Sequence, residues 1–227
     1  MKKTAASKSN VNVATGYGEF DTNCRTDITY EGIQALVDNP QRVDKGAAQW
    51  LIPSTLPSRA FKDQEANGEY LLLWADIDQD PPELREVADA LDEATYVFFS
   101  YYEIYTTRSA REDCQKCRII IPLDEPLVGA DWKLSQECLN DELERHGITP
   151  DRANERHAQL CYLPNRGEYY NSISNRFGDY FNPLDQWAPQ IAAKRQALIE
   201  AERLTQERIA ASKANRAQRL ADGFKSP

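Results

Sequence analysis

Two aspartates, Asp76 and Asp78, end an apolar stretch that runs from Tyr70 to Ala75. The branched and aromatic residues of this stretch predict a buried β-strand. Because side chains alternate across a strand, both carboxylates lie on one face at the end of the strand, and Ile77 points to the other. Two carboxylates so close repel each other, and a bound divalent cation turns that repulsion into attraction. An all-oxygen ligand set favours Mg²⁺ or Mn²⁺ over Zn²⁺.

A third carboxylate often completes such a site, where it bridges two ions or holds the second one. Asp151 is the candidate, because it shortly precedes a strand that we expect over residues 157–164, and a neighbouring strand can bring it to the first two acids. Structural roles are the alternatives. Asp78 can belong to a solvated turn before Pro81, and Asp151 can cap a helix or shape a turn.

The elements that must position these acids follow from periodicity and from breakers. We expect helices over 29–38, from 83 and over 129–146, and strands over 70–78, 95–100 continuing through 103–107, 118–122 and 157–164. This order predicts an α/β or α+β domain over about 28 to 185 or 189. Residues 1–27 are polar and without periodicity, and they predict a flexible leader.

The tail over residues 190–227 is rich in Ala, Arg, Gln, Glu and Lys, which predicts a helix. Its apolar positions form neither a heptad nor a broad face, so we expect it to pack loosely. One interpretation is a charged helical linker to a further module. The other is a basic arm that contacts nucleic acid, since eight Lys and Arg stand against four Asp and Glu there.

The chain as a whole is acidic, with 27 Lys and Arg against 36 Asp and Glu in 227 residues, a net charge of -9. Such a chain repels a polyanion, so nucleic acid would have to bind at a local basic patch or through cations held by carboxylates. The longest apolar run is far shorter than the ~20 residues that span a bilayer. The first residues lack the apolar stretch of a signal peptide. These features predict a cytoplasmic protein with no membrane partner.

Five cysteines, an odd number without a secretion signal, argue against a disulfide framework. Cys114 and Cys117 have the spacing of a zinc knuckle, but the sequence offers no second CxxC or HxxxH to complete four ligands. Cys138 and Cys161 would have to join them through tertiary structure. We therefore expect free thiols, with zinc as the alternative.

Four segments in order resemble the primase-polymerase domains of phage and plasmid replication proteins, in the archaeo-eukaryotic primase superfamily. They are Leu-Trp-Ala-Asp76-Ile-Asp78, Tyr105-Thr-Thr-Arg-Ser109, Arg118-Ile-Ile-Ile-Pro-Leu-Asp-Glu-Pro126, and Asp151 followed by Gln159-Leu-Cys-Tyr-Leu-Pro164. The resemblance covers about residues 40 to 185. It implies an α+β fold in which an RRM-like sheet carries the acids and an additional α/β unit completes the cleft.

The resemblance also implies an activity, namely template-dependent nucleotidyl transfer from nucleoside triphosphates on single-stranded DNA. Asp76, Asp78 and Asp151 would hold two Mg²⁺ or Mn²⁺ ions. Arg118 would bind the triphosphate, because a planar guanidinium suits phosphate oxygens, and a strand-edge ion pair is its alternative. Residues for further nucleotide or template contacts are Ser109, Lys45 and Arg59, with a solvated loop as the alternative for the last two.

One departure from the superfamily concerns its second motif, which usually presents a histidine after a Ser-x spacer, whereas Thr107-Arg108-Ser109-Ala110 has none. One interpretation is that Arg108 or Arg118 takes the place of this cation, and the other is that synthesis is weak or absent. Of the two histidines, His146 is expected at a helix end and His157 at a surface or packing position rather than a catalytic one.

Three functions are compatible with these residues. The first is a metal-dependent primase-polymerase, and a helicase module often follows such a domain in similar proteins. The second is a DNA-binding replication module that has kept the fold and lost turnover. The third is a metal-dependent nuclease, since a carboxylate cluster can also activate water.

Overall fold

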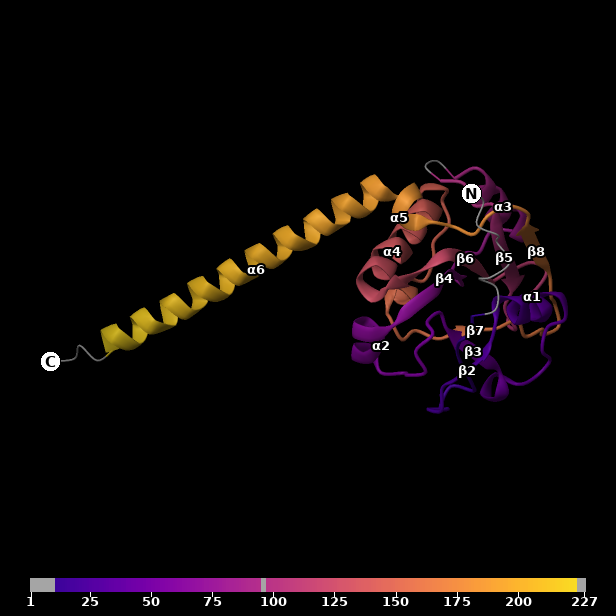
Figure 1. The fold of residues 1–227 in the computed structure, drawn as a ribbon, viewed down its shortest axis with the longest axis horizontal. Helices are drawn as coiled ribbons and strands as arrows, with labels where there is room; N and C mark the ends of the chain where they lie inside the picture. Colours follow the sequence, from indigo (N-terminus) through magenta and orange to yellow (C-terminus); the bar gives the residue numbers. More distant parts are fainter. Residues whose placement is uncertain (1–10, 95–96, 224–227) are drawn as a thin grey trace, which may run out of the picture. The chain divides into compact units, whose positions relative to one another are not determined.

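A computed structural model describes residues 11–94 and 97–223. Two four-stranded sheets, antiparallel in every pairing of neighbouring strands, form the frame of the body (Figure 1). The first sheet has the order β2 (Arg25–Ile28), β1 (Val13–Tyr17), β3 (Gln49–Ile52) and β7 (Cys161–Tyr162). The second has the order β4 (Glu69–Ile77), β6 (Cys117–Val128), β5 (Tyr101–Thr106) and β8 (Ser172–Arg176). The fold class is therefore α+β, as predicted.

The helices begin and end where local chemistry allows. Thr29 caps α1 (Tyr30–Asp38) by accepting a hydrogen bond from the Gly32 N–H at 3.1 Å. Glu83 forms a capping box at the start of α3 (Leu84–Asp92). The remaining helices of the body are α2 (Phe61–Asn67), α4 (Gly129–Arg145), α5 (Pro183–Gln186) and the short 3-10 turns η2 (Lys45–Ala47) and η3 (Arg152–Glu155).

A hydrophobic core joins the two sheets and α1. The fully or nearly buried residues at its centre are Val13 and Leu51 from the first sheet, Trp74, Tyr105 and Ile120 from the second, and Ile33 from α1. Burying a side chain of this size stabilises the fold by about 1.5–3 kcal/mol. The core therefore fixes the ends of β4, β6 and β7 relative to one another.

β4 is an edge strand of the second sheet, and the edge that does not pair with β6 is covered by polar groups of side chains from α4 and η3. Gln136 both accepts from the Trp74 N–H at 3.2 Å and donates to the Trp74 carbonyl at 2.7 Å. The Trp132 indole donates to the Leu72 carbonyl at 2.9 Å, and Asn154 also donates to the Trp74 carbonyl at 2.9 Å. A buried strand edge must have its backbone groups paired, so these side chains hold α4 and η3 in register with β4.

Several sequence-based expectations change with the structure. Residues 13–17 and 25–28 are strands of the first sheet, so a flexible leader over 1–27 is wrong for these segments. The expected strand over 95–100 fails for 97–100, because β5 begins at Tyr101, and residues 95–96 lie outside the described residues. The strand expected over 157–164 is only β7. The strand expected over 118–122 is longer, since β6 ends at Val128.

The chain beyond the body is α6 (Ala188–Gly223), a helix as expected. A compact unit ends at Ala188, and a second unit begins at Pro189. On the surface of α6, Arg203 pairs with Glu200 at 2.7 Å and also with Glu207, in the i,i+3 and i,i+4 positions that stabilise helices. Within the described part of the chain, no helix combines the length and the apolar character that crossing a membrane requires.

His157 is a packing residue rather than a surface residue. It is 2% exposed, and its ring lies 5.4 to 5.7 Å, between centroids, from the rings of Phe61, Trp132 and Tyr70. Its Nδ1 is 3.1 Å from the Tyr70 hydroxyl oxygen. Burial lowers the pKa of His157 from its ordinary value of 6.5. His146, as expected, is the C-cap of a helix, α4.

We expect the buried His157 to make the protein less stable in mild acid. Because the pKa of His157 is lower in the folded chain, its contribution is complete above pH 6.5 and is lost as the pH falls through the folded value. The free energy of unfolding of the wild type, measured by urea denaturation, should therefore fall between about pH 7.5 and pH 5.5, and His157 should contribute up to ~1.4 kcal/mol per pH unit to this slope. His157→Gln should flatten this slope, whatever its midpoint at neutral pH. Equal slopes in the two proteins would contradict the assignment.

Candidate active site

Asp76 and Arg118 are direct cross-strand neighbours, because the register of β4 and β6 pairs their Cα atoms. Nη2 and Nε of Arg118 donate to the same carboxylate oxygen of Asp76, Oδ2, at 2.8 and 3.2 Å. Both side chains are mostly buried, with 16% of Asp76 and 14% of Arg118 exposed. The strand-edge ion pair that the sequence offered as an alternative for Arg118 is thus present, and it is a buried one.

The second oxygen of Asp76, Oδ1, is buried and has no hydrogen-bond partner among the residues that the structure describes. Burial raises the pKa of Asp76 above its ordinary value even though Arg118 acts to lower it, and the negative charges of Asp78 and Asp151 raise it further. Arg118 stays charged, since the neighbouring carboxylate more than offsets the lowering of its pKa by burial. An unpaired buried carboxylate oxygen is costly, and a bound cation would satisfy it.

Asp78 and Asp151 both come near Asp76, by different routes. Asp78 directly follows β4, and its Oδ1 lies 3.8 Å from Nζ of Lys116. The backbone N–H of Asp151 donates to the Asp76 carbonyl at 2.8 Å, which extends the row of contacts along the free edge of β4. Asp78 and Asp151 also line one hollow of about 280 Å³.

The carboxylate of Asp151 is engaged, because it caps η3 by accepting from the Ala153 N–H at 2.9 Å. The capping role that the sequence offered as the alternative is therefore the one that the structure has. Within residues 11–94 and 97–223, no three acidic, histidine or cysteine side chains are arranged to hold a metal ion together. The donors fit a divalent cation by their oxygen chemistry and by the unpaired Oδ1 of Asp76, rather than as a finished cage.

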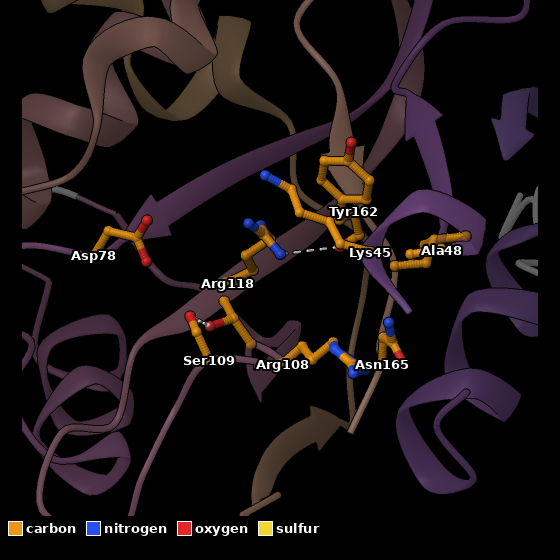
Figure 2. A pocket seen from close by; sticks show the side chains of 10 residues that line it. Lys45, Ala48, Asp78, Arg108, Ser109, Arg118, Tyr162 and Asn165 are labelled. Atoms are coloured by element: carbon orange, nitrogen blue, oxygen red, sulfur yellow. Dashed lines mark hydrogen bonds between the residues drawn. The ribbon is translucent and has the colours of Figure 1, made fainter. Parts of the chain in front are cut away.

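A pocket of about 370 Å³ opens beside the acids, and Figure 2 shows the side chains around it. Its volume is within the usual range for a small-molecule site. Five of the residues proposed from sequence line it: Lys45, Asp78, Arg108, Ser109 and Arg118. Sequence reasoning had not singled out Thr107, Tyr162 or Asn165, which line it as well. Tyr162 lies within the Gln159–Pro164 segment, which was the available signal.

The cations of this pocket differ in how strongly they are already engaged. Arg118 is held by Asp76 and also donates from Nη1 to the Tyr162 carbonyl at 3.4 Å. Arg108 donates to the Val43 carbonyl at 2.6 Å and pairs with a mostly exposed Asp44 at 2.9 Å. Lys45 lies with Nζ 5.8 Å from the centroid of the Tyr162 ring. Among the described residues it has no ion-pair partner, so its ammonium is available to an anion.

Arg59 is a predicted site residue that the structure places away from both the acids and the pocket. It does not line the pocket, and its Nη1 donates to the backbone carbonyls of Glu19 and Asp21 at 3.0 and 2.7 Å. Its guanidinium carbon lies 5.4 Å from the centroid of the Trp50 ring. Arg59 therefore organises the loop between β1 and β2 rather than the floor of the pocket.

Comparison with known proteins adds a likeness of fold. No family model matches the sequence, and no curated protein matches it. A solved structure with a similar backbone is the AEP domain of the primase-polymerase (PrimPol) of cyanophage S-2L. The two chains share 12% sequence identity and a TM-score of 0.48, over 78% of this chain and 88% of that chain. This likeness concerns the arrangement of the chain and assigns no activity or site residue.

The site therefore combines an acidic edge with a cationic pocket. Asp76 and Asp78 supply carboxylate oxygens, and Lys45, Arg108 and Arg118 supply positive charge next to them. A neighbouring hollow of about 540 Å³ shares Arg108 and adds further arginines, Arg42 and Arg166. Asp44 and Glu168 line that hollow too, so the cations gather locally and among acids. Such a local group of cations is what the net charge of the chain requires for binding a polyanion.

Proposed function

We propose that this chain is a metal-dependent nucleotidyltransferase of the primase-polymerase type, which links nucleotides from nucleoside triphosphates on a single-stranded DNA template. The observation that carries this proposal is the buried Oδ1 of Asp76, which has no hydrogen-bond partner among the described residues and belongs to a carboxylate held by the pocket residue Arg118. Carboxylates for cations beside guanidinium and ammonium groups for phosphate are what phosphoryl transfer requires. The ordered motifs around Asp76, Arg118 and Asp151 support the same assignment.

Divalent cations, when bound, would lower the pKa of an attacking 3′-hydroxyl and neutralise charge on the triphosphate. Asp76 would offer Oδ1 to such a cation while Arg118 holds Oδ2, so the guanidinium fixes the direction of the carboxylate. Asp78 would supply a second ligand from the exit of β4. Asp151 would supply a third ligand, for which its carboxylate would release the hydrogen bond that it accepts from the Ala153 N–H. The backbone hydrogen bond from Asp151 to the Asp76 carbonyl keeps Asp151 close to Asp76 without a cation.

The phosphate chain would lie in the pocket. Lys45, which has no ion-pair partner among the described residues, would place its ammonium on the phosphates, and Arg118 would present Nη1, whose hydrogen bond to the Tyr162 carbonyl is long at 3.4 Å. Arg108 and Ser109 also line the pocket, and the Ser109 hydroxyl oxygen is 3.3 Å from that of Thr107. Lys45 of η2 and Arg118 of β6 would thereby bind the phosphate in place of the histidine that the second motif lacks.

The direct test uses the wild-type chain with a single-stranded DNA template, labelled nucleoside triphosphates and Mn²⁺ or Mg²⁺. We expect labelled product that grows with time, that disappears when EDTA is added, and that returns with an excess of Mn²⁺. Ribo- and deoxynucleotides are supplied in separate reactions. Absence of metal-dependent product with either set would overturn the proposal.

The engaged carboxylate of Asp151 favours a second candidate, a DNA-binding module without turnover. This alternative predicts salt-sensitive binding of single-stranded DNA with no product in the reaction above, and binding that survives Asp78→Asn. A nuclease is distinguished in a parallel reaction with metal, a labelled strand and no nucleotides, because the strand would then shorten.

A further inference from the structure

Phe20 is unusually exposed for an aromatic residue, with 89% of its surface accessible. It lies in the loop of residues 18–24, which connects β1 and β2 and which we call the Phe20 loop. A single exposed apolar side chain needs no explanation by itself. What sets Phe20 apart is how its backbone is held and what lies next to it.

The backbone is fixed on both sides of Phe20. The guanidinium of Arg59 donates to the carbonyls of Glu19 and Asp21, the two residues that flank it. The carboxylate of Asp21 accepts from the Tyr17 N–H at 3.2 Å and from the Asn23 N–H at 2.9 Å, and these bonds lower the pKa of Asp21. The aromatic ring is therefore presented to solvent on an ordered loop, which reduces the entropy that a partner must take away on binding.

The Phe20 loop is attached to the rim of the cationic pocket. The Gly18 N–H donates to the carbonyl of Ala48, a pocket residue, at 2.8 Å, and the Trp50 indole donates to the Gly18 carbonyl at 2.7 Å. Gly18 has φ +69°, and a Cβ built there would lie 2.2 Å from the carbonyl oxygen of Gly46. Only glycine allows this close approach to the residue that follows Lys45.

Cations accompany aromatic rings along this part of the first sheet. The guanidinium carbon of Arg25 lies 5.9 Å from the centroid of the Tyr17 ring, which is 42% exposed. Arg59 lies over Trp50 and Lys45 over Tyr162. Trp50 is fully buried, so the rings accessible to a ligand here are Phe20, Tyr17 and the half-buried Tyr162. Accessible rings beside positive charge are the pattern by which proteins bind single-stranded nucleic acid, where bases stack and phosphates meet cations. The carboxylates of Glu19 and Asp21 also lie in the loop, so the attraction is local to the cations named.

We propose that Phe20 is a base-stacking residue, on which an unpaired base of single-stranded DNA stacks next to the nucleotide pocket. The neighbouring phosphates would meet Lys45 and Arg25. This inference rests on the proposed function only for the identity of the strand as a template. The stacking itself needs no metal and no turnover.

The experiment measures binding of a fluorescently labelled single-stranded oligonucleotide without nucleotides or metal, together with the emission of 2-aminopurine placed in the strand. Phe20→Ala should weaken binding by about 5- to 150-fold, which corresponds to ~1–3 kcal/mol per stacked base. It should also remove quenching of 2-aminopurine at one position. Phe20→Tyr should restore both. Phe177→Ala is the matched control, because Phe177 is 84% exposed and follows β8 in the other sheet, and it should change neither.

A second variant separates stacking from charge. Arg59→Lys keeps the positive charge, but the lysine side chain ends one bond short of the Nη1 that donates to the carbonyls on both sides of Phe20. We expect it to lose most of the quenching at the stacked position and to keep the wild-type dependence of binding on salt. Wild-type affinity and quenching in Phe20→Ala, or equal losses in Phe20→Ala and Phe177→Ala, would overturn the inference.

The inference and the proposed function fail in different ways. Product formation with unchanged template affinity in Phe20→Ala would leave the enzyme assignment intact and remove the stacking role. Stacking at Phe20 in a wild-type protein that makes no product would leave the stacking role intact and remove the enzyme assignment. No binding of single-stranded DNA by the wild type would overturn the inference and leave Phe20 as the contact of another partner, such as a protein.

Discussion

Replacing Asp78 by asparagine is expected to lower metal-dependent nucleotide incorporation by about 100-fold or more while the protein stays folded. A cation held by carboxylate ligands stabilises the transition state by several kcal/mol, and each 1.36 kcal/mol changes the rate tenfold. Asparagine keeps the shape of the side chain and removes its charge. The fold should tolerate this change, because the side chain of Asp78 is 49% exposed and its ion-pair contact, Nζ of Lys116, is 3.8 Å away.

Asp78 is a sharper test than Asp76, because removal of Asp76 would also leave Arg118 buried without its partner. The matched control is Asp113→Asn. Asp113 is 78% exposed, pairs with Arg111 at 3.0 Å and does not line the pocket, so this variant should keep wild-type activity. Initial rates are compared at saturating Mn²⁺ with thermal melts of all three proteins. Wild-type rates in Asp78→Asn would exclude Asp78 as a metal ligand.

The sequence was sufficient for the elements whose signals are local. The apolar run before Asp76 predicts β4, and Thr29 and Glu83 mark helix starts that the structure confirms. The alternation along β4 also predicts that Asp76 and Asp78 share a face. These features depend on neighbours within a few residues, which is the range over which side-chain patterns carry information.

Three strands of the first sheet, β1, β2 and β3, were missed, and only part of the strand expected over 157–164 forms as β7, because these strands are short and depend on one another. β1 contains Gly16 within Val-Ala-Thr-Gly-Tyr, and β7 has only two residues, Cys161 and Tyr162. Strands of this kind are stabilised by pairing and packing rather than by intrinsic preference. Gly16 is required there because the Trp50 ring would lie 2.2 Å from a Cβ at this position. Such a contact between β1 and β3 has no signature in either segment alone.

The arrangement of the candidate site also depends on contacts between segments, which the sequence of one segment does not reveal. That Arg118 faces Asp76 is a matter of strand register, which the partner strand decides and which neither segment reveals alone. The approach of Asp151 to Asp76 depends on a backbone hydrogen bond at the covered edge of β4. Arg59 was assigned to the nucleotide because of its position in the sequence, and the structure uses it to hold the Phe20 loop. Residue type alone does not distinguish a cation that binds phosphate from one that binds carbonyls.

Replacing Arg118 by methionine is expected to lower the free energy of unfolding by about 3–5 kcal/mol, the usual cost of leaving one member of a buried ion pair without the other. Asp76 would lose both N–H groups that now bind Oδ2, and its other oxygen already has no partner. Burial raises the pKa of Asp76 even with Arg118 present. Without the guanidinium the carboxylate would take up a proton still more readily.

A double variant separates the ion pair from the loss of packing. Asp76→Leu combined with Arg118→Met removes both charges together and should recover most of the stability that Arg118→Met loses, because an apolar pair of similar volume carries no desolvation cost. Arg85→Met is the exposed control, since Arg85 is 69% exposed and pairs with Asp89 on α3, and it should change stability by less than ~1 kcal/mol. Urea denaturation at neutral pH measures all three. If Arg118→Met loses no more than Arg85→Met, the pair does not anchor β4 to β6, and Arg118 would be free to turn its whole guanidinium toward phosphate.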